Sequence, residues 1–332
     1  MLTFERIAVV GAGAWGTALA QVAHRAGRSV TLWTRRPAQA EELRRTRQNV
    51  RYLPGVALDP AIAVTADPAT LAAAEAVLLA VPAQALRDAG LALRAHLPEV
   101  PLVLCAKGID LSSGLLLDAV VGDLLPGRPL AVLSGPTFAR EVAQGLPTAI
   151  TLAAADEALG EALAQALGSA AFRPYWTDDV TGVLVGGAVK NVIAIACGIV
   201  GGRRLGENAR AALLTRGLAE MLRLAQALGA RRETLMGLAG LGDLVLSATS
   251  AQSRNYALGE RLGQGQSLTE AQGTSKGVTE GVATAAAVVQ LAQRHAVEMP
   301  IAAAVDAVLH RGAAIDSAME ALLARAFKPE RG

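Results

Sequence analysis

The first half of the chain alternates short apolar runs with stretches that have helical spacing of apolar residues. Short aliphatic runs bounded by turn residues are typical of buried strands. The predicted strands cover residues 6–10, 29–33, 62–65, 76–81, 102–106, 130–133, 147–153 and 171–176, with a helix over 156–167. This alternation predicts a mostly parallel, doubly wound α/β sheet whose ligands bind at the carboxyl ends of its strands.

The strand pattern stops after Trp176, and the rest of the chain has helical spacing. The predicted helices cover residues 177–202, 208–228, 278–294, 301–310 and 317–325. We therefore expect an α/β domain over residues 1–178 and an all-α domain over residues 179–332. The length of 332 residues fits two domains, because single cores rarely grow past ~250–300 residues.

The predicted helix over residues 177–202 is apolar on all faces, which is typical of a buried helix. Lys190 and Asn191 nevertheless lie in its middle, and Gly186 and Gly187 precede Lys190 on the same face, where they leave a gap for a ligand. A buried ammonium needs a partner or a lowered pKa. Thr177 or Asp178 is expected to cap this helix.

Lysine is rare in this chain, since only four of its 31 cationic residues are lysines. Such a chain keeps a lysine where arginine cannot serve, and proton transfer is such a task because arginine does not deprotonate. Lys190 is therefore the candidate catalytic residue. The alternative is a lysine whose ammonium reaches the surface.

Residues 11–16 read GAGAWG, directly after the first strand and before a helical run. A strand, G-x-G-x-x-G and a helix together are the context of a dinucleotide-binding Rossmann domain. Gly11 makes the tight turn, Gly13 lets the backbone approach a pyrophosphate, and Gly16 lets the helix close on the strand. Trp15 either pads the helix or lies beside the cofactor.

The second strand ends in Thr34-Arg35-Arg36, where an NAD-selective site has an acidic residue. Two arginines can instead hold a 2′-phosphate. The sequence therefore predicts that NADPH is accepted and preferred, unless Arg35 and Arg36 are only solvated charges at a strand end.

Three further segments carry candidate chemistry. Lys107 follows the fifth predicted strand and can meet an anionic or carbonyl oxygen, and residues 237–243 form a glycine-dense loop ending in Asp243, which can bring a carboxylate to Lys190. Residues 250–255 form a loop that presents Ser253, Arg254 and Asn255 together, a combination suited to binding phosphate. The alternative for residues 237–243 is that they form only a sharp turn. The alternative for residues 250–255 is that they have an ordinary loop composition without a function.

The composition excludes several classes of function. The net charge of +2 with mixed signs and no basic tract argues against nucleic acid as a partner. We expect no apolar run long enough to span a bilayer without interruption, and therefore no membrane partner. Two cysteines in apolar runs fit a cytoplasmic protein, and four scattered histidines predict no metal site.

Taken together, these segments resemble the bacterial-type NAD(P)-dependent glycerol-3-phosphate dehydrogenases, from Ile7 to near Leu323. The matching stretches are GAGAWGTALA, RYLPG, SGPTFAREVAQGLPTA, GGAVKNVIAIACGI, GLAGLGDLVL and SAQSRN. The resemblance implies reversible reduction of dihydroxyacetone phosphate to sn-glycerol 3-phosphate, which supplies phospholipid synthesis. It also implies NADPH as the preferred or equal cofactor, with NADH as the other.

The resemblance implies a role for each matching residue, with Lys190 as the catalytic acid/base. The implied substrate contacts are Lys107, Gly135, Thr137, Lys190, Asp243, Ser253, Arg254 and Asn255. The implied cofactor contacts, with the fingerprint glycines, are Gly11, Gly13, Ala14, Trp15, Gly16, Arg35, Arg36, Tyr52, Lys107, Ala139, Arg254, Val278 and Glu280. Ala14 and Ala83 stand where the family more often has serine, and Arg203-Arg204 lies in a loop that is usually less basic.

Two other functions remain open at this point. A β-hydroxyacid dehydrogenase also pairs a Rossmann domain with a helical domain carrying a catalytic lysine, but the Ser253-Arg254-Asn255 segment favours a phosphate. A catalytically silent dinucleotide sensor has no need for Lys190 and Asp243. The oligomeric state is also open, between a monomer and a homodimer.

Overall fold

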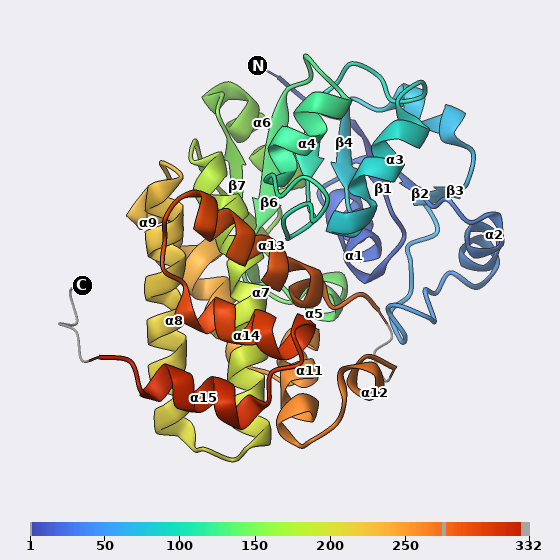
Figure 1. Cartoon of the computed structure of the whole chain (residues 1–332). Coiled ribbons are helices and arrows are strands. Elements are labelled where there is room, and N and C mark those ends of the chain that lie inside the picture. The colour runs from blue at the N-terminus through green and yellow to red at the C-terminus, as the bar shows by residue number, and fades with distance from the viewer. Residues whose placement is uncertain (1, 274–276, 327–332) are drawn as a thin grey trace.

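The computed structural model describes residues 2–273 and 277–326 and has an eight-stranded sheet followed by a helical domain (Figure 1). The strands are β1 (Arg6–Val10), β2 (Ser29–Trp33), β3 (Ala63–Thr65), β4 (Ala76–Leu79), β5 (Leu102–Leu104), β6 (Leu130–Ser134), β7 (Thr148–Ala154) and β8 (Phe172–Thr177). Their order in the sheet is β3-β2-β1-β4-β5-β6-β7-β8. Every neighbouring pair is parallel except β6 and β7, which confirms the mostly parallel sheet expected from the sequence.

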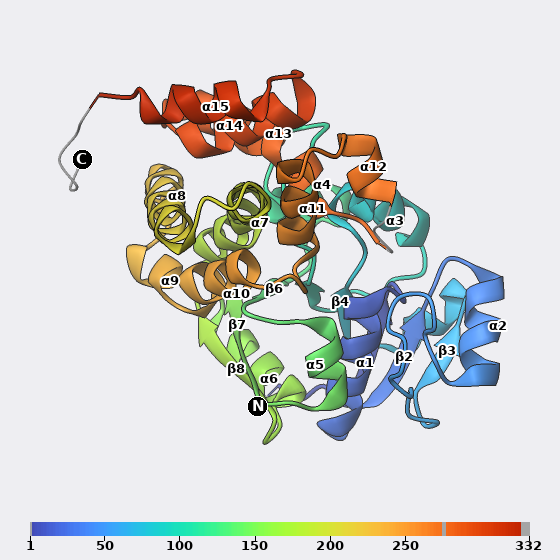
Figure 2. The same ribbon diagram turned by 90° about the horizontal axis from the view of Figure 1, so that it is seen from below.

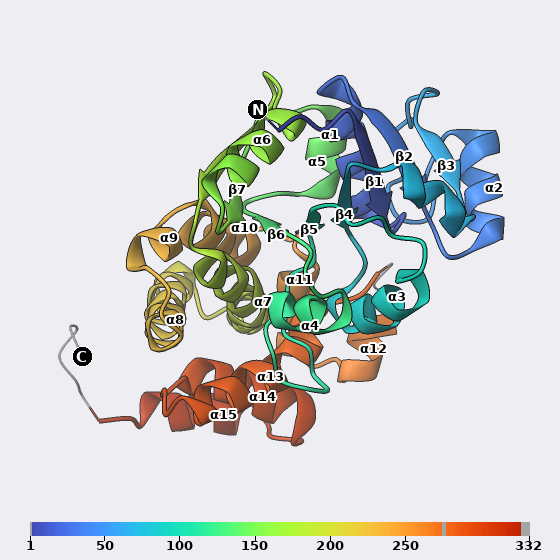
Figure 3. The same cartoon turned by 90° about the horizontal axis from the view of Figure 1, so that it is seen from above.

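Helices cover both faces of this sheet (Figures 2 and 3). One face carries α1 (Ala14–Arg25), α5 (Ala139–Gln144) and α6 (Glu157–Leu167), and the other carries α3 (Leu86–Leu93) and α4 (Leu117–Leu124). Within β1, Ile7 and Val9 pack on the first face, whereas Ala8 and Val10 pack on the second. The alternation follows from the two-residue period of a strand, so a strand buried on both faces reads as a continuous apolar run.

The smaller elements of the α/β domain connect these layers. They are α2 (Pro37–Thr46) beyond β2 and two short 3-10 helices, Pro68–Ala73 and Ala83–Ala85. Pro37 occupies the first turn of α2, where its missing N–H is not needed by the helix. Helix α2 therefore starts directly after Arg35 and Arg36, the two arginines that follow β2.

The second domain is helical and is built around α7 (Val180–Gly202), as Figures 1 and 2 show. The other helices are α8 (Glu207–Ala227), α9 (Arg232–Met236), α10 (Asp243–Thr249), α11 (Arg254–Gly263), α12 (Leu268–Gly273), α13 (Glu280–Arg294), α14 (Pro300–His310) and α15 (Ile315–Leu323), with a π-helical turn at Leu238–Gly242. Helices α8, α10, α11, α13 and α14 all pack against α7. The all-α architecture expected after Trp176 is confirmed.

Helix α7 corrects two expectations. With 23 residues it is long and apolar enough to cross a membrane by length and composition, whereas no such run was expected. That apolar window is entirely buried inside the protein, as in a core helix. The cap of the helix is Asp179 and not Thr177 or Asp178, because the Asp179 carboxylate accepts the Gly182 N–H at 2.8 Å.

Helices α7 and α11 touch through their backbones. A methyl group on Gly259 would lie 2.0 Å from the Ile195 carbonyl oxygen, and one on Gly198 would lie 2.1 Å from the Tyr256 carbonyl oxygen. Any side chain larger than hydrogen would therefore push the two helices apart. The consequence for the site is that the N-terminus of α11 is held close to the middle of α7.

Of the two segments expected to be loops, the first is largely helical and the second is largely a loop. Residues 237–243 fold as the π-helical turn and the start of α10, and residues 250–253 of the second segment lie outside a helix. The turn approaches α7 closely because Gly186 of α7 has no Cβ. A methyl group on Gly186 of α7 would lie 2.6 Å from the Ala239 carbonyl oxygen of that turn.

Candidate active site

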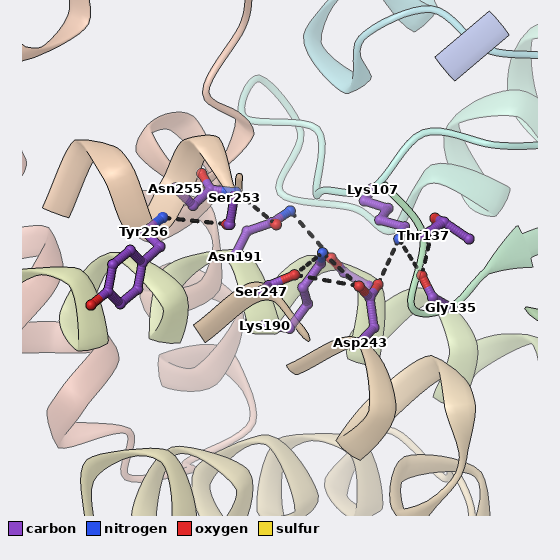
Figure 4. Close-up of polar contacts among 11 residues, drawn as sticks. Lys107, Gly135, Thr137, Lys190, Asn191, Asp243, Ser247, Ser253, Asn255 and Tyr256 are labelled. Atoms are coloured by element: carbon purple, nitrogen blue, oxygen red, sulfur yellow. Dashed lines mark hydrogen bonds and ion pairs between the residues drawn. The ribbon is translucent and has the colours of Figure 1, made fainter. Parts of the chain in front are cut away.

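The centre of the candidate site is a buried carboxylate between two ammonium groups (Figure 4). Lys190 Nζ lies 2.9 Å from Asp243 Oδ1, and Lys107 Nζ lies 2.5 Å from Asp243 Oδ2. The Asp243 side chain is 1% exposed, and Lys190 is 7% exposed as a residue. Lys107 belongs to the α/β domain and the other two residues to the helical domain, so the cluster joins the two domains. Lys190 does not reach the surface, which excludes the alternative considered for it.

Burial and the neighbouring charges shift the pKa values of this cluster. Desolvation lowers the pKa of Lys190 to about 8; the Asp243 carboxylate opposes this shift, and the positive charge of Lys107 adds to it. Burial alone would raise the pKa of Asp243, but the two ammonium groups hold it below its ordinary value. Asp243 is therefore the anion that allows two cations in a dry site, and Lys190 has a pKa suited to proton transfer near neutral pH.

The gap expected beside Gly186 and Gly187 is not available for a ligand. The turn Leu238–Gly242 packs over Gly186, and a methyl group on Gly187 would lie 2.9 Å from Ser134 Oγ. Gly186 instead allows the turn before Asp243 to approach α7, and Gly187 leaves room for the side chains of Ser134 and Lys107. The sequence expectation was right that the glycine-dense segment brings a carboxylate to Lys190, and wrong about what fills the space beside the two glycines.

Ser247 and Asn191 belong to the site geometry although neither was among the candidates. Lys190 Nζ donates a hydrogen bond to Ser247 Oγ at 2.6 Å, and Ser247 lies one turn after Asp243 on α10. Asn191 Oδ1 accepts a hydrogen bond from Asn255 Nδ2 at 2.8 Å. The spacing of four residues between Asp243 and Ser247 is a signal that could have found Ser247.

The segment Ser253-Arg254-Asn255 begins α11 and presents three differently placed side chains. Ser253 is the N-cap, and its hydroxyl accepts the Tyr256 N–H at 3.3 Å. Asn255 is buried, with Nδ2 bonded to Asn191 and Oδ1 accepting the Gly281 N–H at 3.0 Å. Arg254 is exposed. An anion can therefore meet a guanidinium and a helix N-terminus here. The Asn255 amide joins α11, α7 and α13 with one N–H and its oxygen, and its second N–H is left for an anion.

Gly135 and Thr137 lie beside Lys107 at the end of β6. Lys107 Nζ donates to the Gly135 carbonyl at 3.0 Å, and Thr137 Oγ1 donates to the same carbonyl at 3.2 Å. Gly135 has a φ of 157°, and a methyl group there would lie 3.0 Å from the Ile150 side chain. The candidates at the ends of β5 and β6 thus meet at one edge of the sheet, next to Lys190.

The dinucleotide fingerprint has the geometry that a pyrophosphate requires. Gly11 has a φ of 111°, and a methyl group on Gly16 would lie 1.8 Å from the Gly11 carbonyl oxygen, so the helix closes tightly on the strand. A methyl group on Gly13 would meet nothing within 4 Å, so the backbone there faces open space. The indole nitrogen of Trp15 is buried without a hydrogen-bond partner among the residues that the structure describes. These features fit a nicotinamide dinucleotide.

The arginines after β2 differ from each other. Arg35 is exposed, whereas the Arg36 Nη2 donates to the Tyr52 hydroxyl at 3.1 Å and its guanidinium lies 5.8 Å from the Tyr52 ring centre. Ala139 begins α5 and is partly buried. The structure thus brings Arg36 and Tyr52 together, on the side of β1 away from Lys190.

Glu280 and Val278 lie at the start of α13. Glu280 Oε1 accepts the Ala83 N–H at 3.4 Å, and Oε2 is buried without a partner within the described ranges. Burial raises the pKa of Glu280 to about 7. Val278 is 50% exposed. The start of α13 therefore contacts the loop after β4. This loop borders the same crevice as the fingerprint.

Residues 2–273 and 277–326 contain no group of three or more His, Cys, Asp or Glu that could hold a metal ion. Cys105 and Cys197 are buried as free thiols, and burial raises the pKa of Cys197 to about 12. Metal independence remains a prediction of the sequence.

Comparisons with known proteins identify the family. The family described as NAD-dependent glycerol-3-phosphate dehydrogenase N-terminus matches residues 6–160, and its C-terminal counterpart matches residues 179–320. A glycerol-3-phosphate dehydrogenase (NAD(P)+) of Rhodospirillum rubrum is 58% identical over 330 residues, which cover 99% of this chain and 95% of that protein. A protein of the same name from Caulobacter vibrioides is 53% identical and covers 99% of this chain and 100% of its own length.

Solved structures agree with these relatives. A glycerol-3-phosphate dehydrogenase of Coxiella burnetii is 41% identical, with a TM-score of 0.93 over 97% of this chain and 99% of that one. A ketopantoate reductase of Ralstonia eutropha has a TM-score of 0.61 at 18% identity, which shows a shared fold alone. Proteins of this fold therefore act on more than one kind of substrate. Sequence identity along the full length, and not the fold, decides the family. By that measure, the chain belongs to the NAD-dependent glycerol-3-phosphate dehydrogenase family.

Proposed function

We propose that this protein catalyses the reversible reduction of dihydroxyacetone phosphate to sn-glycerol 3-phosphate, with NADPH or NADH as the reductant. The observation that carries the proposal is the buried ammonium of Lys190, which Asp243 and Ser247 hold at the boundary between the sheet and the helical domain. An oxidoreductase of this kind needs one proton donor beside a dinucleotide crevice, and the geometry supports that arrangement.

Lys190 is the catalytic acid in this proposal. The bound nicotinamide supplies a hydride for the ketone carbon. Lys190 donates a proton to the ketone oxygen, and its positive charge stabilises the negative charge that develops there. In the oxidation direction, neutral Lys190 accepts the alcohol proton. A pKa of about 8 lets the same amine serve both directions near neutral pH.

Asp243 keeps this amine in place and favours its charged form, and Lys107 in turn keeps Asp243 ionised. Asp243 bonds both ammonium groups, so each lysine is oriented by the same carboxylate. Lys107 also donates to the Gly135 carbonyl, which holds it at the carboxyl end of β5, where it can polarise the substrate carbonyl. Thr137 fixes the same carbonyl from the other side.

The N-terminus of α11 binds the substrate phosphate. Arg254 supplies a guanidinium there, and the first turn of α11 supplies unpaired backbone N–H groups and a positive helix end. Ser253 and Asn255 orient this turn through their bonds to Tyr256, Asn191 and Gly281. Asn255 also has a second N–H on Nδ2, beyond the one donated to Asn191, which it can donate to the phosphate.

The cofactor lies along the fingerprint and across to the start of α13. The residues assigned to it are Gly11, Gly13, Ala14, Trp15, Gly16, Arg35, Arg36, Tyr52, Lys107, Ala139, Arg254, Val278 and Glu280. Residues 1–178 bind the dinucleotide and residues 179–332 bind the substrate in this proposal, and the preference for NADPH rests on Arg35 and Arg36.

A substrate comparison tests the function. The loss of NADPH absorbance is followed with dihydroxyacetone phosphate, with dihydroxyacetone and with a β-keto acid of similar size. We expect fast oxidation of NADPH with the phosphorylated ketone alone. Faster turnover of the keto acid would instead support a hydroxyacid dehydrogenase, and NADPH binding without oxidation by any ketone would support a sensor.

The cellular setting follows from this activity. We propose a cytoplasmic enzyme that supplies sn-glycerol 3-phosphate for phospholipid synthesis and acts on a small phosphorylated substrate, without nucleic acid or membrane as a partner and without a metal. A homodimer is the proposed assembly, and size-exclusion chromatography with light scattering tests it by giving the mass of the protein in solution.

A further inference from the structure

Gln39 connects the fingerprint loop to the arginine that ends β2. It lies in the first turn of α2, two residues after Pro37. Its Nε2 donates to the Ala12 carbonyl of the fingerprint at 2.7 Å, and its Oε1 accepts from Arg36 Nη2 at 2.8 Å and from Arg36 Nε at 3.2 Å. One neutral side chain therefore bonds both the loop that faces the pyrophosphate and the guanidinium expected to bind a 2′-phosphate.

The orientation of the Gln39 amide is determined by its partners. A guanidinium only donates hydrogen bonds and a carbonyl only accepts them, so the amide oxygen must face Arg36 and the amide nitrogen must face Ala12. Thr34 is buried, and its hydroxyl donates to the same amide oxygen at 2.8 Å. With this orientation determined, Gln39 can hold Arg36 in one geometry.

Arg36 keeps both its charge and part of its hydrogen-bonding capacity. Its Nε and Nη2 donors are used by Gln39 and by the Tyr52 hydroxyl. Arg36 Nη1 makes no hydrogen bond within residues 2–273 and 277–326. This nitrogen of the guanidinium is therefore available to an anion. Because the partners of Arg36 are a neutral amide and a phenol, its positive charge is not cancelled, in contrast to an arginine paired with a carboxylate.

We propose that Gln39 is a positioning and specificity-determining residue that selects NADPH over NADH by holding Arg36 ready for the 2′-phosphate. The inference rests on the proposed use of a nicotinamide dinucleotide at the fingerprint. NADPH and NADH share the pyrophosphate that faces the Ala12 loop and differ only in the 2′-phosphate. Selective loss of NADPH affinity therefore reports on Arg36, whereas a disturbed loop weakens both cofactors equally.

The test measures the Kd of NADPH and of NADH by the fluorescence of the nicotinamide, without any ketone, in wild type, Gln39→Leu, Gln39→Glu and the control Gln48→Leu. Gln48 is an exposed glutamine just after α2 whose side chain makes no hydrogen bond within the described residues. We expect the Kd of NADPH to rise about tenfold in Gln39→Leu, which is the order expected for a hydrogen bond to a charged group. In Gln39→Glu we expect a larger rise, since the carboxylate also cancels the charge of Arg36, while the Kd of NADH changes less than about threefold in either variant.

Equal rises for both cofactors, or no rise for NADPH, would overturn the proposal. A melting temperature close to that of wild type shows that each variant is folded, and an unchanged control excludes an effect of losing any glutamine near α2. The binding readout needs no dihydroxyacetone phosphate. Failure of the proposed reaction would therefore appear in the absorbance assay with wild type, and failure of the Gln39 proposal would appear in the ratio of the two dissociation constants.

Discussion

Asp243 and Glu220 are two carboxylates buried to the same degree, each 1% exposed and each in the helical domain. Asp243 receives the ammonium groups of Lys107 and Lys190. Among the described residues, the hydrogen bonds to Glu220 on α8 come from backbone N–H groups, those of Ile301 at 2.7 Å and Ala302 at 3.2 Å at the start of α14. One carboxylate thus faces two cations, and the other caps a helix.

The two groups have opposite pKa shifts. Burial raises the pKa of Glu220 to about 7, and its backbone hydrogen bonds only reduce that rise. At Asp243 the same effect of burial is outweighed by two positive charges, and the pKa is lowered. Burial alone therefore does not decide whether a carboxylate is charged at neutral pH; the charges beside it do. The candidate active site keeps a buried negative charge in this way.

Removing Lys190, the proposed proton donor beside Asp243, has the largest expected effect. It tests whether the charged cluster serves catalysis. In Lys190→Ala we expect kcat to fall by ~10²–10⁴, the usual contribution of a positioned acid or base. The Kd of NADPH should stay the same, because Lys190 lies on the substrate side of the crevice. Steady-state kinetics and cofactor fluorescence measure the two quantities.

The matched control for this variant is Arg216→Ala, which removes an exposed cation from α8. It should retain the activity of wild type. Turnover near that of wild type in Lys190→Ala would contradict the assignment of Lys190 as the acid.

Removing the negative charge of Asp243 tests how much this carboxylate stabilises the fold. Asp243→Asn keeps the shape of the side chain but leaves two ammonium groups in a dry site without their anion. Breaking a buried ion pair costs about 3–5 kcal/mol, so the free energy of unfolding in urea should fall by that order. An unfolding midpoint equal to that of wild type would contradict this cost and show that the lysines are solvated by water or neutral without Asp243.

Neutralising the other carboxylate should change the pH dependence of stability. Because the folded pKa of Glu220 is about 7, above its ordinary 4.5, the folded state holds the proton more tightly and wild type loses stability as the pH rises from about 4.5 to 7. The amide introduced by Glu220→Gln does not ionise in this range, so in that variant this part of the loss, up to about 3 kcal/mol, should disappear. Urea unfolding at several pH values measures the difference, and parallel curves for the two proteins would contradict it.

The smallest expected effect concerns pH and direction of turnover. With a pKa of about 8, Lys190 is protonated below that pH and neutral above it. The kcat/KM for reduction should therefore fall about tenfold per pH unit above the pKa, whereas kcat/KM for oxidation should rise with pH until the pKa is passed. Profiles with the same slope in both directions would exclude Lys190 as the titrating group.

The sequence predicted those features whose signals are local. The strand before GAGAWG and the helix after it follow from a few consecutive residues, and both are present as β1 and α1. Lys190 stood out because a lone lysine in an apolar helix is visible without knowing what surrounds it. The approach of Asp243 to Lys190 was expected because glycines before a carboxylate allow the backbone to come close.

The features that the sequence did not predict depend on contacts between distant residues. Ser247 meets Lys190 across 57 residues of chain, and that contact exists only because α10 packs on α7. The space beside Gly186 could not be assigned to a ligand or to a backbone turn from the glycine alone. Asp179 and not Asp178 caps α7, a choice of one residue that depends on where β8 ends.

The backbone contact between α7 and α11 has a mechanical consequence. Since Gly198 and Gly259 leave no room for a side chain between the helices, Lys190 and the proposed phosphate-binding turn at Ser253 lie on two helices in direct backbone contact. In the proposed function, this contact therefore sets the distance between the proton donor and the substrate phosphate. We therefore expect the two glycines to favour substrates with one fixed length of chain between the ketone and the phosphate.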